Sequence, residues 1–181
     1  MNQLINKVFK VIDNVTIVSG WLAALSTVVA AIVVTEAIVV RKLLNISTIW
    51  QTEAAVYMLM FTVFVGAAFV QKNEHHLNVD LLLIYLPPRP REIVMIFVSI
   101  LTFGLVTLLA WHSWPMWWQA VLEGERSETL WGPPMWIPLF FLPFGMTLLS
   151  LQYIVYIHKK ITDLKAGRIA EKAERLELRD L

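Results

Sequence analysis

The stretch QKNEHHLNVD, residues 71–80, gathers residue types that bind metal ions or transfer protons. It holds Glu74, His75, His76 and Asp80 within ten positions. Consecutive side chains fan around a helix, however, whereas a helical metal pair needs ligands three or four residues apart. His76 and Asp80 have that spacing, but Asp80 is also a strong N-cap candidate for the apolar run that follows. The pattern favours a capped turn, with neither a metal site nor a catalytic site.

The composition places this stretch at a membrane surface. Of the 181 residues, 57% are hydrophobic and only 16% are charged, whereas an ordinary globular domain carries about 25% charged residues. Four apolar runs that contain almost no charge are each long enough to cross a bilayer. We therefore predict an all-α integral membrane protein, with one membrane domain over residues 1–158. The predicted transmembrane helices cover about 14–40, 48–71, 92–122 and 134–158.

Shorter segments accompany the four spans. Residues 1–13 have apolar side chains at helical spacing and suggest an amphipathic lead-in. The run Leu81–Leu86 is too short to span and should lie at the membrane interface. Residues 159–181 mix basic and acidic side chains, which suits a charged C-terminal tail at the headgroup surface.

The distribution of charge predicts the orientation. Twelve of the 15 Lys and Arg residues lie on the side that holds both termini and the middle loop. Only Arg41, Lys42 and Arg126 lie on the other side. Because basic residues concentrate on the cytoplasmic side, both termini should be cytoplasmic. Seven of the 8 Trp residues fall near the two predicted outer loops, as expected of an interfacial belt.

Little in the spans suggests chemistry. The absence of cysteine excludes thiol and iron–sulfur chemistry in this sequence. A haem held by two histidines needs partners at one depth, and His112 has none. Glu36 is the one charge between Asp13 and Arg41, inside the first span, and is best interpreted as an interfacial or subunit-contact residue. An accessory subunit, with no enzymatic activity, cofactor or nucleic-acid partner, fits better than a self-contained transporter. A membrane anchor of a haem or quinone complex and a structural assembly protein remain alternatives.

Three short patterns share their order and spacing with one known family. They are W-x-x-E-x-x-x-Y…F-x-G-A-A on the second helix, H-L-N-V-D after it, and S…P-x-W…P-x-G from the second outer loop into the fourth helix. The residues are Trp50, Glu53, Tyr57, Gly66, His76, Asp80, Pro134, Trp136, Pro143 and Gly145. Together they resemble the small membrane subunit of tripartite ATP-independent periplasmic (TRAP) transporters, of the DctQ/SiaQ type.

The resemblance implies a role that composition does not. Such a subunit pairs with a large membrane subunit of about twelve helices, which holds the sodium and substrate sites. A periplasmic binding protein delivers an organic acid of the C4-dicarboxylate or sialic acid class. The small subunit would be a fixed scaffold in the bacterial inner membrane, surrounded by lipids, for sodium-driven uptake. Candidates for periplasmic partner contact are Arg41, Lys42, Glu123, Glu125, Arg126 and Glu128.

Overall fold

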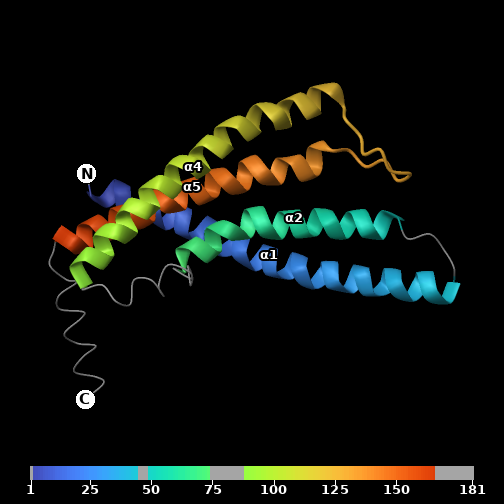
Figure 1. Cartoon of the computed structure of the whole chain (residues 1–181), viewed down its shortest axis with the longest axis horizontal. Helices are drawn as coiled ribbons and strands as arrows, with labels where there is room; N and C mark the ends of the chain where they lie inside the picture. The colour runs from blue at the N-terminus through green and yellow to red at the C-terminus, as the bar shows by residue number, and fades with distance from the viewer. Residues whose placement is uncertain (1, 45–48, 74–87, 166–181) are drawn as a thin grey trace, which may run out of the picture.

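The computed structural model describes residues 2–44, 49–73 and 88–165, and these ranges contain four long helices. Helix α1 covers Asn2–Leu44, α2 covers Ile49–Lys72, α4 covers Pro88–Glu123 and α5 covers Trp136–Lys165 (Figure 1). Each helix contains a segment that is long and apolar enough to cross a membrane. The prediction of an all-α protein with four membrane-crossing helices is confirmed.

Helix α1 is longer than the span expected for it. The residues before position 14, which suggested a separate lead-in, form one continuous helix with the apolar segment. Neither glycine nor proline occurs between Asn2 and Ser19. Because no residue there breaks the backbone hydrogen bonds, the helix continues past the charges of Lys7, Lys10 and Asp13.

The four helices stand side by side in the order α1, α2, α5, α4 (Figure 1). Helix α2 packs between α1 and α5, and α5 packs between α2 and α4. Helix α1 additionally reaches α5 over a short length. This arrangement is a single row of helices, so most side chains on its two broad faces point outward. The described part of the chain therefore lacks the second layer of helices that would enclose a path across the membrane.

Small side chains at a regular interval let the helices approach closely. On α1, the buried residues Thr16, Ala23, Ala30 and Ala37 recur at every seventh position. On α4, the buried face repeats in the same way and consists of Ser99, Val106, Ser113 and Ala120. A seven-residue repeat keeps one side of a helix turned toward its neighbour. Small residues at such a seam are the usual means of close helix packing in membranes.

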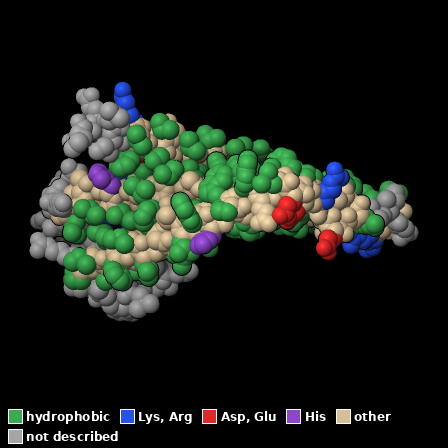
Figure 2. Space-filling model, turned by 90° about the horizontal axis from the view of Figure 1, so that it is seen from above, with side chains coloured by type: hydrophobic (Ala, Val, Ile, Leu, Met, Phe, Trp, Pro, Cys, Tyr) green, Lys and Arg blue, Asp and Glu red, His purple; other side chains and the backbone are tan. Residues whose placement is uncertain are grey.

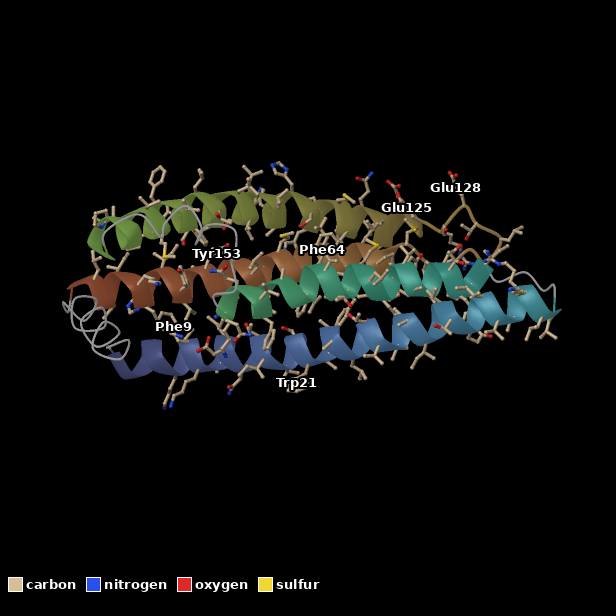
Figure 3. The ribbon with its side chains drawn as sticks, turned by 60° about the horizontal axis from the view of Figure 1, so that its bottom comes forward. Phe9, Trp21, Phe64, Glu125, Glu128 and Tyr153 are labelled. Atoms are coloured by element: carbon tan, nitrogen blue, oxygen red, sulfur yellow. The ribbon has the colours of Figure 1, made fainter. Side chains whose placement is uncertain are left out.

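Helices α2 and α5 approach each other closely at Gly145 of α5. A Cβ atom placed there would collide with the backbone carbonyl group of Phe64 on α2. Figure 3 shows Phe64 where α2 meets α5. Only glycine allows this contact, and we refer to the Gly145–Phe64 contact as the helix crossing.

The two ends of the row differ in chemistry. We call the end that holds Lys72 and Lys159 the basic end. The opposite end, which holds Trp50 and Trp131, is called the aromatic end. Figure 2 shows hydrophobic side chains along most of one face of the molecule, with the acidic and most of the visible basic side chains toward the aromatic end. Such a surface suits hydrocarbon over most of its length.

Candidate functional site

The stretch that first suggested chemistry lies outside the described residues. This applies to Glu74, His75, His76 and Asp80, so the capped turn predicted for them stays a prediction. Within residues 2–44, 49–73 and 88–165, no group of three or more His, Asp and Glu side chains could hold a metal ion. The site-like features of the described chain are instead polar links between helices.

Asp13 joins three helices at the basic end. Its carboxylate accepts hydrogen bonds from Gln152 Nε2 and from Lys159 Nζ, both on α5 and both at 3.2 Å. Lys72 of α2 donates to the backbone carbonyl of Asp13 at 3.0 Å, and its Nζ lies 3.9 Å from the carboxylate. We call these four residues the Asp13 cluster. It fixes the relative positions of α1, α2 and α5 where the chain leaves the apolar region.

A second layer of polar contacts supports this cluster from inside the membrane. The buried Thr16 hydroxyl donates to Gln152 Oε1 at 3.2 Å, so both ends of the Gln152 amide are engaged by α1. Burial of an amide is costly unless it is hydrogen-bonded, so these bonds offset the cost of placing Gln152 there. Our sequence interpretation missed these residues. The available signal was polar residues, Thr16 and Gln152, inside otherwise apolar runs.

The second-helix pattern lies at the aromatic end. Trp50 packs against Trp131 of the α4–α5 loop, with ring centroids 6.5 Å apart. The Tyr57 hydroxyl lies 3.8 Å from the sulfur of Met135, just before α5. Among the residues of the second-helix pattern, Glu53 has the least expected environment. Both of its carboxylate oxygens are buried, and neither has a hydrogen-bond partner among the described residues.

Two further links hold α1 against α2, one nearer each end of α2. Gly66 faces α1, since a Cβ atom there would lie 3.1 Å from the Cβ of Ala23. Glu36 accepts a hydrogen bond from the buried Gln51 Nε2 at 3.3 Å. Glu36 therefore has a partner within its own chain, in the neighbouring helix of the same hairpin. The residues of the second-helix pattern consequently lie at contacts of α2 with α1, with α5 and with the loop.

Helices α4 and α5 are joined by an aromatic cluster. The Trp114 indole donates to Thr147 Oγ1, and the Trp117 indole donates to the backbone carbonyl of Trp136, both at 3.1 Å. The ring of Phe140 packs against both of these tryptophans. Their indole N–H groups are therefore satisfied within the protein, in contrast to the interfacial belt predicted from the sequence, whose N–H groups would face water. Trp111 and Trp118, on the same helix, are exposed.

The loop between α4 and α5 is shaped by backbone hydrogen bonds. Ser127 N donates to the carbonyl of Pro133 at 3.0 Å, and Met135 N donates to that of Glu125 at 2.9 Å. Gly124 and Gly132 have positive φ angles of 61° and 59°, which favour glycine at the two turns. The loop runs beside itself as a short hairpin, in which Arg126 bridges Pro134.

The residues predicted to contact a periplasmic partner are all exposed. Arg41 and Lys42 are in the last turn of α1, and Glu123 ends α4, where it accepts from Gln119 at 2.7 Å. Glu125, Arg126 and Glu128 project from the loop, as Figure 3 shows for the two glutamates. Pro143 and Gly145 lie inside α5 and are buried, so they act through packing. The six charged residues are thus exposed at one end of the molecule, whereas Pro143 and Gly145 are buried within the packed helices.

Comparison with known proteins assigns this amino-acid sequence to a family. The family model described as "Tripartite ATP-independent periplasmic transporters, DctQ component" matches residues 17–163, which include all of α2 and α4 and most of α1 and α5. The chain belongs to the DctQ family. It is also similar to the C4-dicarboxylate TRAP transporter small permease protein DctQ of Vibrio cholerae serotype O1. The two are 29% identical, over 75% of this chain and 69% of that protein.

Membership of the DctQ family confirms the resemblance inferred from the three sequence patterns. The chain is an inner-membrane protein and a small component of a TRAP transporter. The family is a family of transporter components, not of enzymes, and membership implies association with a large membrane subunit and a binding protein. The matched region contains the Asp13 cluster's partners Lys72, Gln152 and Lys159, the helix crossing and the aromatic cluster.

Proposed function

We propose that this chain is the small scaffold subunit of a sodium-driven TRAP importer of a C4-dicarboxylate. The observation that supports the proposal is the single row of helices, tied together by the Asp13 cluster and the helix crossing. A row without a second layer offers no place for a hydrophilic solute within the bilayer, where unsatisfied polar groups are costly. Ion and substrate binding therefore belong to the large membrane subunit, which this chain supports.

The choice of substrate class follows from the relative. The similar protein from Vibrio cholerae is named for C4-dicarboxylate transport, which favours that class over sialic acid. Sodium dependence is proposed for the complex as a whole. No described residue of this chain is assigned to sodium or to the substrate.

We further propose that the basic end faces the cytoplasm and the aromatic end faces the periplasm. Lys72 and Lys159 would then lie on the side where basic residues concentrate. Arg41, Lys42 and the exposed glutamates would lie where a secreted binding protein can reach them. The chain has no cysteine, so a single cysteine at Glu125 or at Lys165 can be labelled without background. An impermeant maleimide added to intact cells should label the first position and spare the second.

The decisive experiment reconstitutes the large subunit in proteoliposomes, with and without this chain, together with the binding protein. Labelled succinate should accumulate only when all three components and an inward sodium gradient are present. Uptake by this chain alone would contradict the scaffold role. Uptake that is equally fast without this chain would leave it no part in transport. Accumulation of sialic acid in place of succinate would change the substrate class.

A further inference from the structure

Among the described residues, helix α4 packs against α5 with one side, and its opposite side is exposed. Val106, Ala110 and Ser113 are buried on the side that meets α5. The exposed residues half a turn away share the other side, because residues three, four and seven apart align on a helix. We call this side the outer face of α4, and it comprises Phe97, Leu101, Gly104, Leu108, Trp111, His112 and Pro115.

His112 is the first of three features that are unfavourable on a lipid-facing surface. It lies within the apolar segment Ile93–Glu123, eleven residues before the helix ends, or about 16 Å along the axis. The imidazole is exposed and has no hydrogen-bond or ion-pair partner among the described residues. Histidines within membrane spans nearly always face protein or a water-filled cavity, because hydrocarbon satisfies neither ring nitrogen.

Pro115 adds a second polar group on the same face. Proline has no backbone N–H, so it cannot donate to the carbonyl of the residue four positions earlier, which is Trp111. That carbonyl lies next to His112 and lacks its usual partner within the helix. In membrane helices, such freed carbonyls are commonly satisfied by side chains of neighbouring helices. The outer face therefore carries one imidazole and one backbone acceptor at the same depth.

Gly104 is the third feature. It is exposed, and a Cβ atom placed there would meet no atom within 4 Å. Nothing in the described part of the chain requires a glycine at that position, and glycine is less favourable than alanine inside a helix. An exposed glycine on a membrane helix lets the backbone of another helix come close. It lies on the same stripe as His112 and Pro115, two to three turns away.

The outward side of α1 shows what a purely lipid-facing surface of this protein looks like. It consists of Val18, Trp21, Leu25, Val28 and Ile32, all exposed and all apolar. Trp21 points away from the bundle in Figure 3. The Trp21 indole N–H is the polar group of this stripe, which has no histidine, no proline and no glycine. Hydrocarbon tails suit its other side chains.

From this contrast we infer that the outer face of α4 is covered by a transmembrane helix of the large membrane subunit. The inference rests on the proposed function, which supplies that partner. A neutral imidazole offers one donor and one acceptor, and the freed carbonyl offers one acceptor. The covering helix should therefore present a hydroxyl or carboxamide side chain at the depth of His112, with a closely approaching backbone opposite Gly104.

Photo-crosslinking within the assembled complex tests this assignment. A benzophenone amino acid is placed at Leu101, Leu108 or His112 on α4, and in matched variants at Leu25, Val28 or Ile32 on α1. The α4 positions should yield adducts with the large subunit, and the α1 positions should yield at least fivefold less. Adducts from α1 alone, lipid adducts alone at α4, or a dimer of this chain would each overturn the inference.

Wild-type co-purification separates this test from that of the proposed function. If the large subunit does not co-purify with the unmodified chain, the scaffold role fails. If it co-purifies but does not crosslink to α4, only the present inference fails.

Substitutions at His112 provide a second measurement. His112→Leu should lower the amount of large subunit retained after detergent washing by about three- to tenfold, within the range for a polar contact between membrane helices. His112→Asn, which keeps a donor and an acceptor, should retain most of it. Because His112 has no polar partner among the described residues, the isolated subunit should remain equally folded in both variants. Equal retention with Leu and with Asn would overturn the inference.

Discussion

The two ends of the helix row are held together by different forces. At the basic end, the Asp13 carboxylate of α1 interacts with Lys72 of α2 and with Gln152 and Lys159 of α5. At the aromatic end, α4 and α5 are joined by ring packing and by indole hydrogen bonds. The helix crossing at Gly145 lies between them. Charged groups link α1, α2 and α5 at the basic end, whereas ring packing and neutral hydrogen bonds link α4 and α5 at the aromatic end.

This difference explains how a single row remains rigid. Every helix in the row except α5 has at most two neighbours among the described helices, so each contact must resist sliding as well as separation. Hydrogen bonds with defined partners fix the register along the helix axes, and apolar seams alone do so less specifically. The predictions below disturb first the crossing and then each end. All are measured on the purified subunit in detergent by denaturant titration.

The largest effect is expected at the helix crossing. Gly145→Ala places a methyl group against the backbone of Phe64, so α2 and α5 must separate. We expect the free energy of unfolding to fall by about 2–3 kcal/mol, as for other overpacked sites. Gly104→Ala is the matched control, because its methyl group meets open space. It should be neutral or stabilise by about 0.5–1 kcal/mol. Equal losses of unfolding free energy at both positions would mean that the close contact with Phe64 does not account for the effect at Gly145.

The second-largest loss of unfolding free energy is expected when the Asp13 charge is removed at the basic end. Asp13→Asn removes the carboxylate and leaves Lys72 and Lys159 facing an uncharged amide. We expect a loss of about 1–2 kcal/mol, typical of hydrogen bonds to charged groups. The loss should shrink at high salt, because ions screen exposed charges. Glu125→Gln in the exposed loop should change the unfolding free energy by less than about 0.5 kcal/mol. A salt-independent loss at Asp13 would argue against an electrostatic link.

A smaller effect is expected at the aromatic end. Thr147→Val removes the acceptor for the Trp114 indole, while the side chain keeps its volume. The unfolding free energy should fall by about 0.6 kcal/mol, the average for such bonds between membrane helices. This loss should not depend on salt. Thr35→Val is the control, because the Thr35 hydroxyl donates to the Ala31 carbonyl of its own helix, as the Thr147 hydroxyl does to that of Pro143, and has no other partner among the described residues. If the control loses as much as Thr147→Val, the link to Trp114 contributes nothing.

The smallest effect should distinguish the two lysines of the Asp13 cluster. The Lys159 side chain is 56% exposed, whereas that of Lys72 is 20% exposed and also binds the Asp13 backbone carbonyl. Lys159→Gln should cost no more than about 0.5 kcal/mol, as for a surface ion pair. Lys72→Gln should cost more than Lys159→Gln. The reverse order would place the main contact of Asp13 on α5.

The sequence was sufficient to predict the four spans. Charge-free runs of this length have few alternatives, because the bilayer thickness sets the length of a crossing helix. The extent of α1 was underestimated because Lys7, Lys10 and Asp13 suggested a boundary. Charged residues reduce membrane affinity but do not break a helix, and the structure continues through them.

The links between helices could not be predicted in the same way. Asp13 and Gln152 are 139 positions apart, and their meeting depends on the register of α1 against α5. Gly145 was recognised as part of a family pattern, but its contact with the Phe64 backbone required the crossing geometry. His112 was noted only as a histidine without a haem partner. Whether it faced α5 or the outside depended on which side of α4 is buried.

The unequal lengths of α1 and α2 have a consequence for the membrane itself. Helix α1 has 43 residues and measures about 64 Å, whereas α2 has 24 residues and measures about 36 Å. A bilayer with its headgroups is about 40–45 Å thick, so α2 fits and an upright α1 does not. Because the two helices are packed together, any tilt that shortens the projection of α1 also tilts α2. The angle of the whole row should therefore follow bilayer thickness, which makes lipid chain length a determinant of how this subunit presents its faces to a partner.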